Sequence, residues 1–595
     1  MSDLYVSVVW WIILTAGGFA LWPIAHRLCP SAGAGFTFSK VIFPGVMSLL
    51  MIWFSTLHLL PFNTLVVWLL LLLLGVISWL KKSRLQALLK SISKEWKSII
   101  LFEVFFLLLL AIGIYFRGLT PELESLEKMM NVGFLNSIYR TDYLPAADMW
   151  FAGSPINYYY GGHIAVSVWI KMSGIMPAIS YNLAIASVFA FTGTLAFQIG
   201  FTMLKSKRHG MTTLKTRRSI TRLSFFSGFT TFLLVILGSN GQPIIYDEKS
   251  PLSFIGRFFT TRWPDVAGSM DRYWYPAATR FIGYNPELPD KTIHEFPIYS
   301  FIVSDLHAHV INLMFVFAFL LVIVHWLLRT KPIREMSLKR MAVGQKKRES
   351  DAISLISATR LELKYYLTNK YVLVSAFFLA LFMIGNYWDF VMYVAVLGGA
   401  LLFFARTDRK LPWLTKTSIP LLLIQAAGVL AVFLLVPTPW MAALFYVLLA
   451  IANTILFKAS PARVTMTGSM LSVIFALAHL FALPFNWHFE PIGKTLKMVN
   501  QRTSVYQFLI LWGVMLLLTS LLLFVQRVIS KDRHSLLLLL LAGFGLLFLI
   551  VPEIVYVVDV YGGDFSRANT MFKFTYQAFV LLMLVLAVSP WRLLR

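Results

Sequence analysis

The stretch TLVVWLLLLLLGVISWL, residues 64–80, decides the class of fold. It carries no charged residue and approaches the roughly 20 apolar residues that a helix needs to cross a bilayer. The whole chain has 595 residues, of which 58% are hydrophobic and 13% charged. Its mean hydropathy is +0.73, whereas a soluble domain carries much more charged surface. The sequence therefore predicts an all-α polytopic membrane protein.

Charge and cysteine content exclude several other classes. The net charge of +25 would suggest nucleic acid in a soluble protein, but in a membrane protein Lys and Arg gather in cytoplasmic loops, so no nucleic-acid partner is expected. A single cysteine, Cys29, excludes an intramolecular disulfide and a multi-cysteine metal site. The sequence has no glycine-rich phosphate loop and no zinc spacing, which argues against a cytosolic nucleotide-using enzyme.

Apolar runs predict about 15 spanning segments. Their approximate limits are 5–27, 41–60, 62–80, 99–116, 180–204, 223–238, 299–328, 371–386, 388–405, 418–436, 440–457, 466–485, 506–527, 535–556 and 571–590. The first segment has no basic region before it and no obvious cleavage site, so we expect it to be retained as a span.

Basic loops predict the topology. The positive-inside rule places five of them in the cytoplasm, namely 81–97, 205–222, 329–348, 406–410 and 527–533. Threading the spans between them puts the N-terminus outside and the C-terminus inside the cell (plasma) membrane. If 161–177 also spanned, loop 205–222 would lie outside with all its Lys and Arg. We therefore predict that 161–177, with Lys171 near its end, is an amphipathic helix in the outer interface.

The same topology predicts the organisation of the chain. Extra N-terminal transmembrane helices occupy 1–98, and a central module with outer loops 117–160 and 239–298 occupies 99–410. C-terminal transmembrane helices with outer loops 486–505 and 557–570 occupy 411–595. Most ionisable residues that are hard to explain as solvated loop residues fall on the external face. Such groups at a membrane edge favour function, and their convergence suggests one cavity.

The first outer loop carries three candidate catalytic carboxylates. Glu127 opens a helix that we predict to reach about Arg140, and Asp142 and Asp148 follow on irregular backbone. A carboxylate beside a membrane-facing pocket can act as a general base if burial tunes its pKa. The alternative for each of them is an ordinary solvated loop residue.

The loop ends in GSPINYYYGGH, residues 153–163. Its tyrosines could bind a sugar through stacking and hydroxyl contacts, or they could form an interfacial aromatic belt. Asn157 and His163 fit the belt less well. We therefore predict a sugar or acceptor pocket that includes Asn157, Tyr158, Tyr159, Tyr160 and His163.

A second polar motif is HEFPIYSFIVSDLHAHVINLMF, residues 294–315. Helical spacing predicts Asp305 and His309 on one face, four residues apart, with His307 turned away. These side chains could orient a base, hold a phosphate or bind a divalent ion, although a lone histidine is usually structural. We include Glu295 in the predicted pocket.

Two further motifs complete the predicted site. In GNYWDF, residues 385–390, Asn386, Trp388 and Asp389 lie where two spans meet. In DFSRANTMFKFTYQ, residues 564–577, Arg567 and Lys573 are cations at the outer end of a span. They suit a phosphate leaving group, with Asn569 between them, unless they snorkel to lipid headgroups.

Four stretches resemble the "YYY" family of bacterial and archaeal multi-span membrane proteins. They are 127–163, 294–309, 385–390 and 567–579, and they run in order from about residue 100 to the end, leaving out the first three spans. That family in turn resembles GT-C glycosyltransferases, which use sugars on lipid phosphates. The resemblance implies a GT-C-like helical bundle.

In GT-C enzymes an acidic residue follows the span before the first outer loop. A segment with proline and tyrosine then leads into an interfacial helix. Glu127, Pro155 with Tyr158–Tyr160, and 161–177 match that order. The resemblance therefore implies that Glu127 is the acidic residue, with Asp142 and Asp148 as rivals. Asn131 stands where an acidic residue is expected in relatives, which argues against a catalytic Asn131.

The leading hypothesis is a glycosyltransferase that moves a sugar from a polyprenyl-phosphate donor to a glycan, lipid or protein hydroxyl at the external face. Glu127, or else Asp148, would be the base, and Arg567 with Lys573 would hold the lipid phosphate, with His307, His309 and Asn569 as further phosphate-binding candidates. Mg²⁺ or Mn²⁺ is a candidate cofactor, with Asp305 and His309 as ligands. The alternatives are a flippase for lipid-linked saccharides, which needs polar groups through the bilayer, and a scaffold without chemistry.

Overall fold

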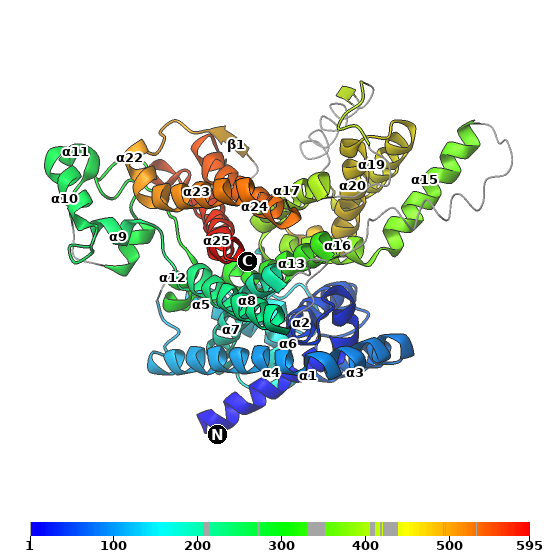
Figure 1. The fold of residues 1–595 in the computed structure, drawn as a ribbon. Helices are drawn as coiled ribbons and strands as arrows, with labels where there is room; N and C mark the ends of the chain where they lie inside the picture. Colours follow the sequence, from blue (N-terminus) through cyan, green and yellow to red (C-terminus); the bar gives the residue numbers. More distant parts are fainter. Residues whose placement is uncertain are drawn as a thin grey trace. The chain divides into compact units, whose positions relative to one another are not determined.

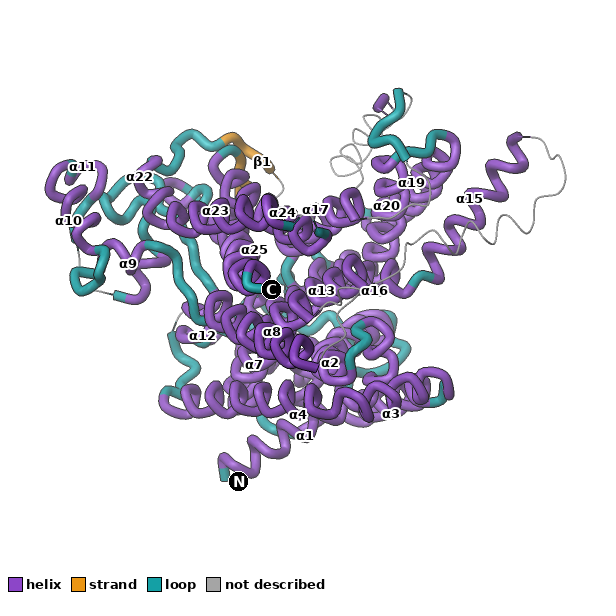
Figure 2. The backbone as a smooth tube through the Cα atoms, in the orientation of Figure 1, coloured by secondary structure: helices purple, strands orange, loops and turns teal. Residues whose placement is uncertain are grey.

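The computed structural model describes residues 2–125, 127–205, 214–270, 274–329, 351–404, 411–416, 419–420, 438–491, 493, 495–530 and 532–595. Helices dominate this part of the chain, and its strands form one two-stranded sheet (Figure 2). The all-α prediction is therefore confirmed. The predicted span 418–436 and the basic loops 329–348 and 406–410 lie largely outside the described residues.

Long apolar helices make up most of the described chain. Twelve of them are long and apolar enough to cross a membrane, or 13 if the bent pair Leu355–Thr368 and Lys370–Gly385 counts as one span. The predicted span 62–80 is a shorter apolar helix, Thr64–Trp79. The chain is thus a polytopic membrane protein, while the number of about 15 spans stays a prediction.

The chain folds into two compact units whose segments alternate along the sequence. Unit 1 comprises Met1–Phe191 and Leu306–Phe489, and unit 2 comprises Thr192–Asp305 and Glu490–Arg595. This division differs from the three sequential parts predicted from the loops, which remain a prediction. The charge of a loop indicates on which side of the membrane the loop lies. The compact units are instead decided by packing between segments that are distant in the sequence.

The regular elements in the described part of unit 1 are helices. They are α1 (Asp3–Leu28), α2 (Ala32–Thr56), α3 (Thr64–Trp79), α4 (Lys82–Leu119), α5 (Lys128–Arg140), α6 (Gly161–Ser173), the first part of α7 (Pro177–Lys205), α13 (Ala308–Arg329), α15 (Asp351–Thr368), α16 (Lys370–Gly385), α17 (Tyr387–Phe404), α19 (Pro439–Ala459), α20 (Arg463–Phe481) and α21 (Leu483–His488). Helices α1 to α4 pack together at the start of the chain (Figure 1).

Helix α6 forms in the segment predicted to lie in the interface. Its 13 residues span about 20 Å, too short to cross a bilayer. Every residue from Gly161 to Met172 is buried, against α1, α2, α3, α5, α13 and α16. An amphipathic surface helix leaves its polar face open, so the predicted surface packing is corrected: α6 is a core helix of unit 1.

Lys171 enters this core with specific partners. Its ammonium donates to the carbonyl of Tyr139 at 2.9 Å and lies 4.8 Å from the centre of the Phe62 ring. Burial lowers the pKa of Lys171 to about 8, opposed by the charge of Asp142. Contacts inside unit 1 therefore explain this lysine, in place of the predicted interface.

The predicted span 299–328 is broken. Helix α12 (Pro297–Val303) ends at Ser304, which has a left-handed φ of +58°, and α13 begins at Ala308. The prediction that Asp305 and His309 share one helical face was therefore wrong, because the residues from Ser304 to His307 are not helical. Asp305 belongs to unit 2, and His307 and His309 belong to unit 1.

Unit 2 combines helices with the short sheet. Besides the rest of α7 and α12 it contains α8 (Leu214–Ile236), α9 (Gln242–Tyr246), α10 (Ser253–Arg262), α11 (Pro264–Ala267), η1 (Tyr275–Thr279), β1 (Thr495–Met498), α22 (Val505–Phe508), η2 (Leu509–Gly513), α23 (Val514–Ile529), α24 (Arg533–Ile550), η3 (Val551–Glu553), β2 (Val555–Val558), η4 (Gly563–Phe565) and α25 (Ala568–Leu593). Helix α25 packs against α8, α23 and α24. The antiparallel strands pair Thr495 with Val558 and Met498 with Val555.

Candidate functional site

A carboxylate and an imidazole meet in unit 1. Glu127 immediately precedes α5, and His307 immediately precedes α13. The Nδ1 atom of His307 lies 2.5 Å from Oε2 of Glu127. The Glu127 side chain is 49% exposed and that of His307 is 13% exposed. The nearly buried imidazole therefore contacts one carboxylate oxygen, while the Glu127 side chain stays accessible at the surface of unit 1.

Tyr158 extends this pair. Its hydroxyl lies 2.7 Å from Nε2 of His307. The tautomer of His307 decides which of the two groups, Nε2 or the Tyr158 hydroxyl, donates in this bond. The Tyr158 ring packs at 5.2 Å from that of Phe134. We call Glu127, His307 and Tyr158 the relay, because a carboxylate, an imidazole and a phenol lie in contact in series.

His163 and Asn131 support the relay from within. The Asn131 amide donates to the backbone carbonyl of Glu127 at 2.9 Å, and its Oδ1 faces Nε2 of His163, also at 2.9 Å. Both side chains are fully buried. Burial and the neighbouring His307 lower the pKa of His163 to about 3, so the imidazole is neutral. Asn131 thus fixes the start of α5 to the start of α6.

The other two tyrosines of the run face apolar partners. Tyr159 packs on Phe489 at 5.0 Å, and Tyr160 packs on Phe485 at 5.3 Å between ring centres. Burial raises the pKa of Tyr159 to about 12 and raises that of Tyr160 as well. Both phenols are therefore neutral. Asn157 is exposed at the beginning of the run.

The two rival residues, Asp148 and Asp142, make other contacts. Oδ1 of Asp148 accepts from the backbone N–H groups of Trp150 and Phe151, both at 2.8 Å. This arrangement stabilises the turn in which Asp148 lies. The backbone carbonyl of Asp142 accepts from Phe62 N–H at 2.6 Å. Of the three predicted bases, Glu127 is the one that the described contacts join to His307.

A second polar pair lies deeper in unit 1. The Asn312 amide on α13 donates to Asp389 on α17 at 2.6 Å, and Asp389 is fully buried. Asn386 is buried between α16 and α17, and Trp388 is half-buried. The His309 ring lies 5.0 Å from that of His307. These predicted pocket residues therefore belong to the same unit as the relay.

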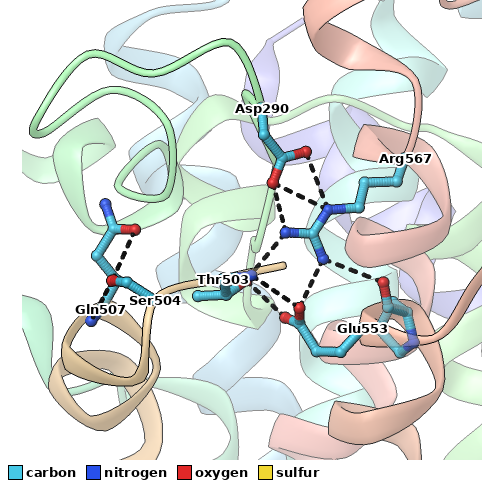
Figure 3. Close-up of polar contacts among 7 residues, drawn as sticks. Asp290, Thr503, Ser504, Gln507, Glu553 and Arg567 are labelled. Atoms are coloured by element: carbon cyan, nitrogen blue, oxygen red, sulfur yellow. Dashed lines mark hydrogen bonds and ion pairs between the residues drawn. The ribbon is translucent and has the colours of Figure 1, made fainter. Parts of the chain in front are cut away.

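Arg567, the predicted phosphate ligand, lies in unit 2 and is 2% exposed. Its polar partners are drawn in Figure 3. Its guanidinium donates to both oxygens of Asp290, to Oε2 of Glu553 at 2.8 Å and to the Thr503 hydroxyl at 3.0 Å. A further bond reaches the carbonyl of Pro552. These contacts engage all three guanidinium nitrogens, so the partners of Arg567 in this structure are groups of the protein itself. Its phosphate role stays a prediction.

The remaining predicted residues of unit 2 also have internal partners. Asn569 donates to Asp559 at 2.9 Å, and Glu295 pairs with Arg280 at 3.0 Å. The Lys573 ammonium lies 4.3 Å from the centre of the Phe572 ring and is nearly buried. Sequence reasoning missed Asp290 and Glu553, because nothing in their local pattern indicates pairing with an arginine on α25.

A divalent ion is chemically compatible with the relay. Carboxylate oxygen and imidazole nitrogen are ligands that suit Mn²⁺. Glu127 and His307 supply one of each, and Asp305 lies two residues before His307 in the chain. Nδ1 of His307 and Oε2 of Glu127 lie 2.5 Å apart here, so an ion would replace that direct contact. His309, predicted as a ligand, is nearly buried beside His307.

Fold and site together define a polytopic helical membrane protein with a polar cluster at the ends of its helices. The sequence matches the family described as "Uncharacterized membrane protein (DUF2298)" over residues 46–542 and 517–582. Because the match covers more than half of the chain, the protein belongs to this family. No match was found among curated proteins or among solved structures.

Proposed function

We propose that the protein is a glycosyltransferase that moves a sugar from a polyprenyl-phosphate donor to an acceptor hydroxyl at the external face of the cell membrane. The observation that carries the proposal is the relay of Glu127, His307 and Tyr158. A partly exposed carboxylate oriented by an imidazole is suited to accept a proton from a hydroxyl. The relay residues lie in the stretches that resemble the "YYY" family and, through it, GT-C enzymes.

The reaction balances with Glu127 as the base. The acceptor hydroxyl gives its proton to the Glu127 carboxylate while the acceptor oxygen attacks the anomeric carbon of the sugar. The bond between that carbon and the phosphate oxygen breaks, and the lipid phosphate leaves with the electron pair. His307 holds Oε2 of Glu127, which directs the other oxygen toward the accessible side.

Other residues position this base. Asn131 binds the Glu127 backbone and the His163 ring, so it acts through its neighbours and not on the substrate. Tyr158 and the exposed Asn157 are proposed to contact the sugar. A bound Mg²⁺ or Mn²⁺ would neutralise charge on the leaving phosphate, and Glu127 and His307 would be its ligands in unit 1.

One observation favours a transporter instead. Lys40 on α2 is 1% exposed and pairs with Glu103 on α4 at 2.5 Å. The Trp11 indole also reaches Glu103 at 3.4 Å. All three residues lie in candidate spans, and ionisable groups inside a membrane often mark a transport path. A flippase of lipid-linked saccharides is therefore the second candidate.

A turnover assay separates the two candidates. Purified protein in lipid nanodiscs would receive polyprenyl-phosphate sugars together with candidate acceptor hydroxyls, with and without Mn²⁺, and free lipid phosphate would be measured. The proposal predicts catalytic release of lipid phosphate. Donor binding without release, together with movement of the donor between leaflets in proteoliposomes, would support the flippase and overturn the enzyme.

A further inference from the structure

Helix α10 of unit 2 carries an aromatic and basic stripe that none of the preceding roles uses. The stripe consists of Phe254, Arg257, Phe258, Thr261 and Arg262. The steps of three and four residues place these side chains on one continuous helix face. Together they line a surface hollow of about 490 Å³.

The opposite face of α10 is fixed to its own unit. Ser253 and Gly256 are buried. A Cβ atom at Gly256 would lie 2.4 Å from the carbonyl oxygen of Ile245, so the glycine permits close packing on α9. Tyr246 of α9 bonds to the carbonyl of Ala267 and to the hydroxyl of Tyr506. The stripe therefore projects from an anchored helix, which lies beside α9 and α11 in Figure 1.

The stripe is open and apolar as well as cationic. Phe254 is 62% exposed and Phe258 is 59% exposed. Trp263, at the end of the helix, is 48% exposed and packs edge-on against Phe258. Exposed aromatic groups of this size in a soluble region would favour aggregation, but aromatic side chains are enriched where a membrane protein meets the bilayer surface.

The charges specify the kind of partner. Arg257 donates to the Ser253 hydroxyl at 2.8 Å. Within the described part of the chain neither Arg257 nor Arg262 lies within ion-pair distance of a carboxylate. Guanidinium groups bind phosphate through paired N–H donors. The aromatic side chains can contact acyl chains and the arginines can bind phosphates. The stripe therefore complements an anionic lipid surface.

We propose that α10 lies on the bilayer surface, with Phe254 and Phe258 among the acyl chains and Arg257 and Arg262 bound to phosphates of anionic phospholipids. Helix α10 would then be an interfacial helix of this protein, in place of α6. Amphipathic helices with aromatic residues on one side and arginines beside them bind membranes in this way. The proposal is independent of the glycosyltransferase assignment.

Spin labelling tests the insertion. Cys29 is fully buried, so the unmodified chain is the labelling blank. A nitroxide on Phe258→Cys in the full chain, in nanodiscs of phosphatidylcholine with phosphatidylglycerol, is expected to be accessible to oxygen and protected from a water-soluble nickel reagent. The control is Glu287→Cys, because the Glu287 side chain is 81% exposed. Equal nickel access at both positions would overturn the proposal.

The arginines are tested in the same assay. Changing both Arg257 and Arg262 to Gln should reduce insertion by up to about 25-fold in nanodiscs with phosphatidylglycerol, since each basic residue near an anionic surface strengthens binding roughly fivefold. Insertion that responds neither to phosphatidylglycerol nor to these changes would overturn the phosphate contact. Dipolar broadening between labels would identify a second copy as the occupant and contradict the lipid assignment.

Discussion

At the scale of single residues, the Tyr158 hydroxyl completes the relay by its bond to His307. Tyr158→Phe keeps the ring against Phe134 and removes the hydroxyl that makes that hydrogen bond. We expect turnover to fall about tenfold, as the loss of one hydrogen bond in a transition state implies, while thermal stability stays close to that of the wild type. Lipid-phosphate release and the melting temperature would be measured together.

Tyr115→Phe is the matched control, because Tyr115 is 64% exposed and lies on α4. It should leave turnover unchanged. If Tyr158→Phe behaves like Tyr115→Phe, the tyrosine hydroxyl has no part in the reaction.

His163 gives a prediction for pH. Its pKa is about 3 in the folded protein and about 6.5 in an unfolded chain. Below pH 6.5 the unfolded chain therefore binds a proton that the folded protein does not. The free energy of unfolding should therefore decrease as the pH is lowered. The loss should be roughly 1 kcal/mol per pH unit and should end near pH 3.

Melting temperatures of the wild type and of His163→Gln, measured between pH 7 and pH 4, would check this. The variant should show a flatter pH dependence, whereas His58→Gln should keep the wild-type slope, because His58 is exposed. An unchanged slope in His163→Gln would show that this imidazole is not buried in its neutral form.

The individual site residues were predictable to different degrees. Glu127 was one of three candidate carboxylates in the first outer loop, and the resemblance to GT-C enzymes favoured it over the two aspartates. His307 was predicted to turn away, since an unbroken helix was assumed through 299–328. The left-handed backbone at Ser304 breaks that helix, and a serine in an apolar run gives no local signal of such a break.

At the scale of the helix, the two glycines after the tyrosine run allow α6 to enter the core. A Cβ atom at Gly161 would lie 2.4 Å from a side-chain carbon of Ile384 and 2.8 Å from its backbone oxygen. Gly161→Ala should therefore destabilise the protein by roughly 1–3 kcal/mol, as overpacking does in a dense core. The melting temperature in detergent is the measurement.

Gly118 near the end of α4 has nothing within 4 Å of its Cβ position. Gly118→Ala should thus be neutral or slightly stabilising. Equal effects of the two changes would contradict the close approach of α6 to the end of α16.

Helix positions followed well from hydropathy, because an apolar run of sufficient length has few other stable conformations in a bilayer. The surroundings of the polar side chains could not be predicted from hydropathy. The polar residues of α6, among them His163 and Lys171, suggested a wet interface, but each of them finds its partners inside unit 1.

At the scale of the whole molecule, Arg567 joins distant parts of unit 2. It binds Asp290, Thr503 and Glu553 (Figure 3), which lie far apart in the sequence. Arg567→Gln would leave two carboxylates without their cation. We expect a loss of about 3–5 kcal/mol in the free energy of unfolding, as for other broken buried ion pairs.

The control is Arg502→Gln, because Arg502 is an exposed arginine beside the same cluster, in the lining of a pocket that includes Asp290 and Thr503. It should keep wild-type stability. If Arg567→Gln were as stable as Arg502→Gln but bound donor weakly, Arg567 would be the phosphate ligand predicted from the sequence.

The membrane class and the helical fold could be predicted from composition and hydropathy alone. The two compact units could not, since their segments alternate along the chain, with boundaries inside α7, at the break before α13 and just after α21. Long-range packing decides such a division, and local periodicity does not report it. The orientation of the protein in the membrane stays a prediction.

The assignment of Glu127 as the base is the central claim, and release of lipid phosphate tests it most directly. Wild type, Glu127→Gln and Asp148→Asn would be compared, with Glu124→Gln as an exposed carboxylate control from the same loop. We predict that Glu127→Gln lowers release by at least about 100-fold, whereas Asp148→Asn and Glu124→Gln remain active. Full release by a well-folded Glu127→Gln protein would contradict the account.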